Sequence, residues 1–87
     1  MKIIKDMEVK TIIDVRTPGE FMGGNVLGSI NIPLSEITSK LEDIKKMDQP
    51  IVLCCASGGR SAQATMFLKQ HGVDCINGGS WLDVNGL

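Results

Sequence analysis

The residues best suited to chemistry lie in the loop Cys55–Arg60, with the sequence CASGGR, directly after the apolar run Ile51–Cys54. A cysteine reacts as its thiolate and therefore needs neighbours that stabilise negative charge. Loops at the carboxyl ends of parallel strands are the usual ligand sites of open α/β sheets. The position of Cys55 at the start of such a loop predicts a nucleophile. The alternative is an ordinary strand-to-helix turn with a buried, inert thiol.

The rest of this loop is typical of an anion-binding site. Gly58 and Gly59 permit positive φ, so the loop can turn successive backbone N–H groups inward as a nest. A helix predicted over Ser61–His71 adds the positive end of its dipole, and Arg60 adds a permanent charge at the rim. These features are expected to stabilise the thiolate of Cys55 and to lower the pKa of its thiol.

The segments around the loop predict the strands that must position it. Short β-branched or apolar runs predict strands, and the stretches between them have helical spacing or helix caps. The predicted strands are Thr11–Val15, Ser29–Ile32, Ile51–Cys54 and Val73–Ile76. Strands that alternate with helices at this spacing imply parallel units with right-handed crossovers. We expect one α/β domain over residues 1–87, with a small parallel sheet of four or five strands flanked by helices.

Two further helices are expected before the reactive loop, Cys55–Arg60. Thr17 supplies the N-cap and Pro18 the first helical position of a short helix that the pair Gly23–Gly24 ends. Ser35 is expected to cap the next helix. Its apolar face consists of Ile37, Leu41 and Ile44, at spacings of four and three residues.

Charged residues near the end of the first strand are expected to order the reactive loop. Asp14 and Arg16 lie where the loops of a parallel sheet gather, and a buried carboxylate is normally paired. The alternative is an ordinary, partly exposed ion pair. Glu20 is expected either to pair with Arg60 or Arg16 or to lie on a solvated helix face.

The remaining cysteines are interpreted as structural. By strand alternation Cys54 should point to the face opposite Cys55, as a buried thiol rather than a resolving cysteine. Cys75 lies in the last predicted strand and is assigned to the core. Helical spacing also predicts core positions for Met66 and Phe67.

Composition excludes several classes of protein. Nine Lys and Arg against ten Asp and Glu give a net charge of -1, without the basic surplus of a nucleic-acid-binding protein. No apolar stretch approaches the roughly 20 residues of a membrane helix. The opening residues MKIIKDMEVK interrupt their apolar run with charge, so no signal peptide is expected. Three cysteines without a CxxC pair favour a cytoplasmic, reducing location and disfavour a metal site, and no cofactor is expected.

Four motifs in order make this chain similar to the rhodanese-like sulfurtransferases. They are IIDVRTPGEF at 12–21, GSINIP at 28–33, CASGGRS at 55–61, and the pair Gly78–Gly79 with Trp81. The resemblance implies that Cys55 takes a sulfane sulfur from a donor such as thiosulfate and carries it as a persulfide. The sulfur then passes to cyanide or to a thiol, such as that of a thioredoxin-like protein. The persulfide would be bound by the backbone of Ala56, Ser57, Gly58, Gly59 and Arg60.

Two details of the loop bear on its substrate. Four residues separate Cys55 from Arg60, whereas related phosphatases of this architecture have a longer loop, so the resemblance favours sulfur transfer. Relatives that favour thiosulfate often carry a basic residue after the cysteine. Ala56 stands there in this chain and leaves Arg60 as the main side-chain cation for a dianionic donor. A persulfide carrier and a non-catalytic interaction module are the alternative functions.

Overall fold

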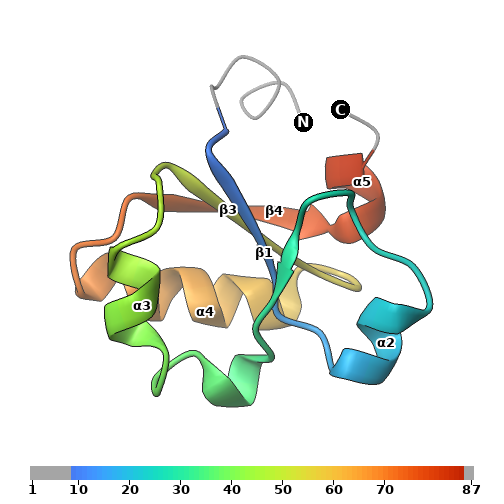
Figure 1. Ribbon diagram of the computed structural model, residues 1–87, viewed down its shortest axis with the longest axis horizontal. Helices are drawn as coiled ribbons and strands as arrows, with labels where there is room; N and C mark the ends of the chain where they lie inside the picture. Colours follow the sequence, from blue (N-terminus) through green and yellow to red (C-terminus); the bar gives the residue numbers. More distant parts are fainter. Residues whose placement is uncertain (1–8, 86–87) are drawn as a thin grey trace.

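The computed structural model describes residues 9–85 (Figure 1). Its elements are β1 (Thr11–Asp14), α2 (Pro18–Met22), β2 (Ile30–Asn31), the 3₁₀ helix η1 (Leu34–Glu36), α3 (Leu41–Lys45), β3 (Ile51–Cys55), α4 (Gly59–Gln70), β4 (Cys75–Ser80) and α5 (Trp81–Asn85). The strands form one sheet in the order β2-β1-β3-β4, and every neighbouring pair is parallel. The expected α/β fold is confirmed, with four strands. The expectation about a signal peptide falls mainly on residues 1–8, outside the described residues.

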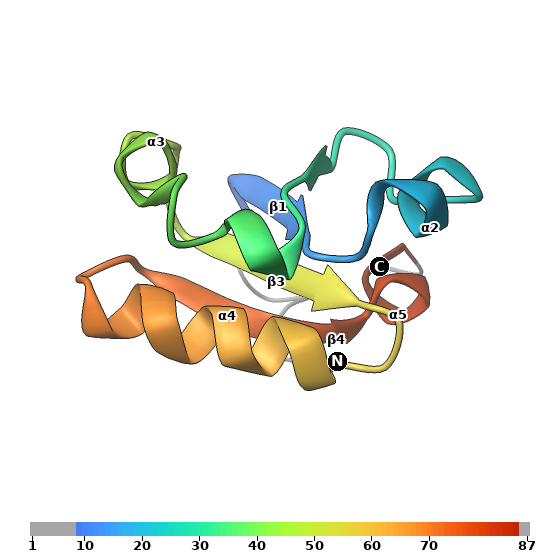
Figure 2. The ribbon, with the colours of Figure 1, turned by 90° about the horizontal axis from the view of Figure 1, so that it is seen from below.

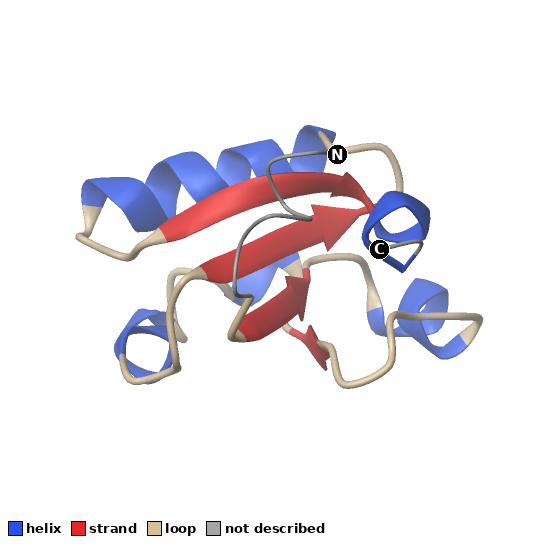
Figure 3. Cartoon of the chain, turned by 90° about the horizontal axis from the view of Figure 1, so that it is seen from above, coloured by secondary structure: helices blue, strands red, loops and turns tan. Residues whose placement is uncertain are grey.

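The sheet separates two layers of apolar side chains. Helices α3, α4 and η1 cover one face, and α5 lies against the other face near the carboxyl ends of the strands (Figures 2 and 3). The first face carries the larger core, which includes Ile13, Leu53 and Leu68. The second face carries a smaller cluster around Val52 and Val84. Strand β3 is buried along its whole length, which explains why its sequence is continuously apolar.

The segment between β2 and β3 differs from the single helix that the sequence predicts. Pro33, not Ser35, is the N-cap of η1, and α3 begins separately at Leu41. The hydroxyl of Ser39 donates to the carbonyl of Glu36, a local bond that competes with continuous helix. The predicted apolar face is nevertheless confirmed. Ile37 and Ile44 are buried in the main core, and Leu41 packs against it.

The last strand begins and ends later than its sequence predicts. The N–H of Val73 donates to the carbonyl of Leu68, so Val73 is bonded to the end of α4 and not to the sheet. Strand β4 then runs through the two glycines, with a bulge opposite Leu53 and Cys54. A Cβ on Gly78 would lie 2.6 Å from Val52 Cγ1 and 2.7 Å from Val84 Cγ2, so this close packing requires glycine.

Other predicted boundaries shift by one or two residues. β1 ends at Asp14, β2 keeps only Ile30–Asn31, β3 includes Cys55, and α4 begins at Gly59. The prediction for Met66 is wrong, since this side chain is exposed on α4, whereas Phe67 packs against the core. Among residues 9–85, no helix is long and apolar enough to cross a membrane.

Candidate active site

The reactive loop lies at the carboxyl end of β3, between that strand and α4 (Figure 2). Cys55 is the last residue of β3, and Gly58 is the N-cap of α4. The segments that carry α2 and α5 lie near the same end of the sheet (Figure 3). The parallel topology therefore brings the loop and the ends of β1 and β4 to one edge, as expected for a ligand site of an α/β sheet.

The sulfur of Cys55 accepts hydrogen bonds from the start of α4. The backbone N–H of Gly58 donates to Sγ at 2.9 Å, and the hydroxyl of Ser61 lies 3.4 Å from Sγ. Burial raises the pKa of the Cys55 thiol. Hydrogen bonds from the Ser61 side chain and from the backbone of Ser61, Gly58 and Ser57 outweigh this effect, and the pKa falls to about 7.

The other two cysteines have the opposite electrostatic environment. Burial, followed by the charge of Asp14, raises the pKa of Cys54 to about 12. Burial also raises the pKa of Cys75. Cys54 belongs to the smaller apolar cluster and Cys55 to the larger one, which confirms that the two neighbours point to opposite faces.

The loop owes its curvature to one glycine rather than two. Gly58 has a φ of 102°, the left-handed conformation that favours glycine, and a Cβ there would lie 3.3 Å from Gly79 Cα. The prediction of positive φ at Gly59 is wrong, because this residue is already the first residue of α4. This left-handed residue turns the chain from the loop into α4, of which Gly58 is the N-cap.

Ser61 and Asn77 form a link from the loop to β4 that the sequence analysis missed. The hydroxyl of Ser61 lies 2.6 Å from Asn77 Oδ1, so Cys55 Sγ and this amide oxygen share its single proton as alternative acceptors. Asn77 Nδ2 donates to the Gly58 carbonyl at 3.1 Å. The same Oδ1 accepts from the N–H of Gly79 at 3.0 Å. A hydroxyl one turn into the helix after Cys55 was a usable signal for Ser61. No local spacing pointed to Asn77.

Arg60 lies at the rim of the site, the exposed edge of the reactive loop, and forms an ion pair with Glu20. Its Nη1 and Nη2 donate to the two carboxylate oxygens of Glu20 at 2.7 and 3.0 Å. Both side chains are about one-third exposed. This decides between the alternatives for Glu20, whose partner is Arg60. The pair joins α2 to the start of α4.

Asp14 and Arg16 form a buried ion pair at the end of β1. Arg16 Nε and Nη2 donate to the Asp14 carboxylate at 2.7–3.0 Å. The same guanidinium donates to the carbonyls of Glu20 and Gly24 and lies 4.7 Å from the ring centre of Trp81. Within residues 9–85 the hydrogen bonds of the Arg16 side chain therefore organise α2 and the turn after it. Glu20, whose carbonyl accepts from Arg16, is also the partner of Arg60 and so connects this pair to the reactive loop.

The electrostatics of the loop predict site-selective alkylation. Cys55 is expected to react with iodoacetamide with a pH midpoint near 7, because its thiolate is stabilised by the hydrogen bonds at the start of α4. Cys54 and Cys75 should react only at higher pH, since burial raises their pKa. Peptide mapping after alkylation across a pH series measures each midpoint. A midpoint for Cys55 at or above about 8.5, the value of a free thiol, would contradict the proposed environment.

Comparison with known proteins places this fold and loop in a family. The family model of the rhodanese-like domain matches residues 1–81. The chain belongs to the rhodanese-like domain family. The crystal structure of a rhodanese-related protein from Thermoplasma volcanium superposes with a TM-score of 0.81 at 32% identity, covering 95% of this chain and 82% of that one. Among residues 9–85 no group of three potential metal-binding side chains is present.

Several relatives of this rhodanese-like chain are named sulfurtransferases. A sulfurtransferase of Allochromatium vinosum is 35% identical over 69 residues, 79% of this chain and 64% of that protein. The thiosulfate sulfurtransferase PspE of Escherichia coli is 31% identical over 74 residues, 83% of this chain and 71% of that protein. The uncharacterized protein YqhL of Bacillus subtilis is 43% identical over 61 residues, 70% of this chain. The match spans only 48% of YqhL.

Proposed function

We propose that this rhodanese-like domain is a sulfurtransferase that carries a sulfane sulfur on Cys55. The observation that carries the proposal is the Gly58 N–H, aimed at Cys55 Sγ at 2.9 Å in a loop that lowers the pKa of this thiol to about 7. A thiol with this pKa is about half ionised at neutral pH, and it is a nucleophile without an added base. The relatives named sulfurtransferases support the same reaction class.

The proposed reaction has two displacement steps. The Cys55 thiolate attacks the outer sulfur of the donor, a new S–S bond forms, and the donor's own bond to that sulfur breaks. The leaving group, sulfite from thiosulfate or a thiolate from a persulfide, departs with the electron pair. A cyanide ion or an acceptor thiolate then attacks the outer sulfur of the Cys55 persulfide. The S–S bond breaks and the Cys55 thiolate is restored, so no other oxidant or reductant is consumed.

The loop backbone is assigned the role of stabilising the anionic persulfide. The residues assigned are Ala56, Ser57, Gly58, Gly59 and Arg60. The N-terminus of α4 supports this assignment, because the first N–H groups of a helix have no partner within the helix and favour an anion at that end. The assigned acceptor is a small thiol or the thiol of a thioredoxin-like protein. Cys55 is 1% exposed, so both donor and acceptor must present a slender sulfur group.

Intact-mass measurement tests the proposed function. Incubation with thiosulfate or with cysteine persulfide is expected to add the mass of one sulfur atom to the chain, and peptide mapping should place it on Cys55. Addition of dithiothreitol should remove the sulfur and release sulfide, because the acceptor thiolate attacks the persulfide. Failure of both donors to load Cys55 would refute the proposal, as would loading of Cys54 or Cys75 instead.

A further inference from the structure

The ion pair at the rim fixes the charge that a donor meets. Arg60 and Glu20 come from α4 and α2, and they meet through two parallel hydrogen bonds of 2.7 and 3.0 Å. This two-point geometry is stronger and more directional than a single contact between an ammonium group and a carboxylate. One full positive charge at the entrance is therefore matched by one full negative charge.

Glu20 is held in place independently of Arg60. The N–H and the hydroxyl of Thr17 lie 3.0 and 3.1 Å from Glu20 Oε1, as part of the capping box of α2. The hydrogen bond from Arg60, with those from Thr17, lowers the pKa of Glu20 to about 2 despite desolvation. The carboxylate is thus fixed by its own helix and ionised at every pH at which the thiolate of Cys55 is populated.

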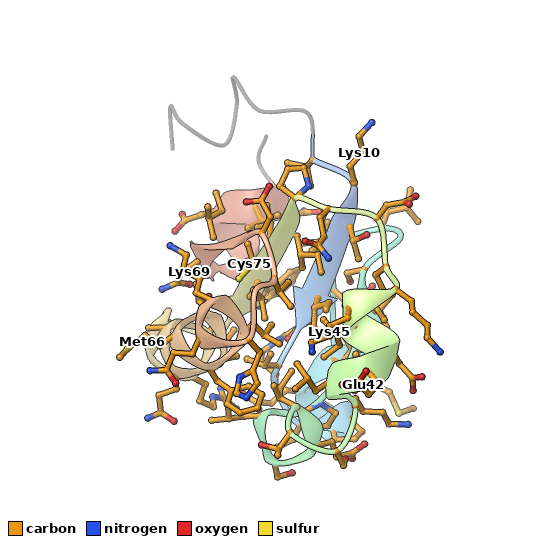
Figure 4. The ribbon with its side chains drawn as sticks, turned by 90° about the vertical axis from the view of Figure 1, so that its left-hand side faces the viewer. Lys10, Glu42, Lys45, Met66, Lys69 and Cys75 are labelled. Carbon is orange, nitrogen blue, oxygen red and sulfur yellow. The ribbon has the colours of Figure 1, made fainter. Side chains whose placement is uncertain are left out.

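Arg16 cannot supply an unpaired positive charge beside the reactive loop either. The chain has two arginines, and Arg16 is buried against Asp14. Among the lysines, Lys45 and Lys69 lie on α3 and near the end of α4 (Figure 4). That side is opposite the carboxyl ends of the strands (Figure 2). At the rim, each arginine is therefore offset by its own carboxylate.

A rim on which both arginines are paired with carboxylates discriminates between sulfur donors by their charge. Thiosulfate is a dianion and needs an uncompensated cation to offset its loss of solvation. A persulfide carries its reactive sulfur with at most one negative charge, which the loop N–H groups can accommodate. We propose that Glu20 is a specificity-determining residue, which neutralises Arg60 and so favours persulfide donors over the thiosulfate dianion. This inference rests on the proposed function.

The wild type and three variants of the Glu20–Arg60 pair test the inference. Relative to the wild type, Glu20→Gln adds one positive charge, Arg60→Gln removes one, and the double variant has the wild-type charge. Glutamine at position 20 keeps an acceptor for Thr17 and so preserves the cap of α2. Glu42→Gln is the matched control, since this carboxylate lies 3.6 Å from Lys45 on the far side of the molecule (Figure 4).

The expected values of kcat/KM for thiosulfate follow the rim charge. Glu20→Gln should raise kcat/KM about tenfold, since it frees a charge-assisted donor, and Arg60→Gln should lower it by a similar factor. The double variant and Glu42→Gln should stay within about threefold of the wild type, a range typical of small surface effects. With cysteine persulfide, Glu20→Gln should stay within about threefold of the wild type, as should the control Glu42→Gln. Added NaCl should leave the wild-type value for thiosulfate almost unchanged, whereas it should lower that of Glu20→Gln.

Three results would overturn the inference. The first is a double variant as slow with thiosulfate as Arg60→Gln, which would mean that Arg60 contacts the donor despite Glu20. The second is no gain in Glu20→Gln, or an equal gain in Glu42→Gln. The third, which requires no variant, is a steep fall of the wild-type thiosulfate rate with salt. Sulfur loading of wild-type Cys55 keeps the proposed function intact in each of these cases, so the two failures are distinguishable.

Discussion

The Cys55→Ser variant is expected to lose sulfur transfer by roughly 10⁴-fold or more in kcat/KM, the scale on which removal of a covalent nucleophile acts. A serine hydroxyl is not ionised near neutral pH, and the hydrogen bonds at the start of α4 cannot make it a nucleophile without a base. Steady-state rates with a persulfide donor measure the loss. Circular dichroism should show that the variant remains folded.

The two neighbouring cysteines provide the controls for this experiment. Cys54→Ser and Cys75→Ser should keep most of the activity, because the Cys54 thiol lies on the opposite face of the sheet and Cys75 pairs with Ile51 at the far end of β3. Each should instead lower the free energy of unfolding by about 1–3 kcal/mol, since a buried hydroxyl replaces a thiol. A folded Cys54→Ser protein without activity, beside an active Cys55→Ser protein, would reverse the assignment of the nucleophile.

The Asp14→Asn variant is expected to lose about 3–5 kcal/mol of the free energy of unfolding, because it leaves the guanidinium of Arg16 buried without its counter-charge. Asp14 is fully buried and Arg16 is 4% exposed. The loss is large beside the roughly 5–15 kcal/mol by which small domains are stable. Urea unfolding followed by circular dichroism measures it.

An exposed ion pair on the same molecule calibrates this value. Glu42→Gln breaks the contact of Glu42 with Lys45 on α3, where the two side chains are 78% and 41% exposed. Its free energy of unfolding should change by less than about 1 kcal/mol. If Asp14→Asn were equally mild, the buried pair would not be what holds α2 and Gly24 against the end of β1.

Much of the fold follows from local patterns in the sequence. The apolar run of β3 and the capping signal of Thr17 depend on neighbours within a few residues, and both are confirmed by the structure. Strand β4 is less predictable, because glycine usually marks a turn. Gly78 lies within a strand instead because Val52 and Val84 leave no room for a side chain. That constraint is tertiary and leaves no local signature.

The candidate site divides in the same way. A cysteine before a glycine-rich loop and a helix is a local pattern, so Cys55 is identifiable from sequence. The links that support it join distant segments. Ser61 and Asn77 are 16 residues apart, and Glu20 and Arg60 are 40 residues apart. Their meeting depends on the strand register and on the placement of α2, which no short-range spacing specifies.

The arrangement of the three cysteines has a consequence for how long a bound sulfur stays on the protein. Cys54 points to the other face of the sheet, and Cys75 lies opposite Ile51. Four residues of strand, about 13 Å at 3.3 Å per residue, separate Ile51 from Cys55. A disulfide needs Cα atoms within about 7 Å, so Cys75 cannot reach the loaded sulfur, and the chain contains no further cysteine. Under the proposed function the lifetime of the loaded form is therefore set from outside, in proportion to the inverse of the acceptor concentration. When acceptors are scarce, the domain acts as a reservoir that holds one sulfur atom per molecule.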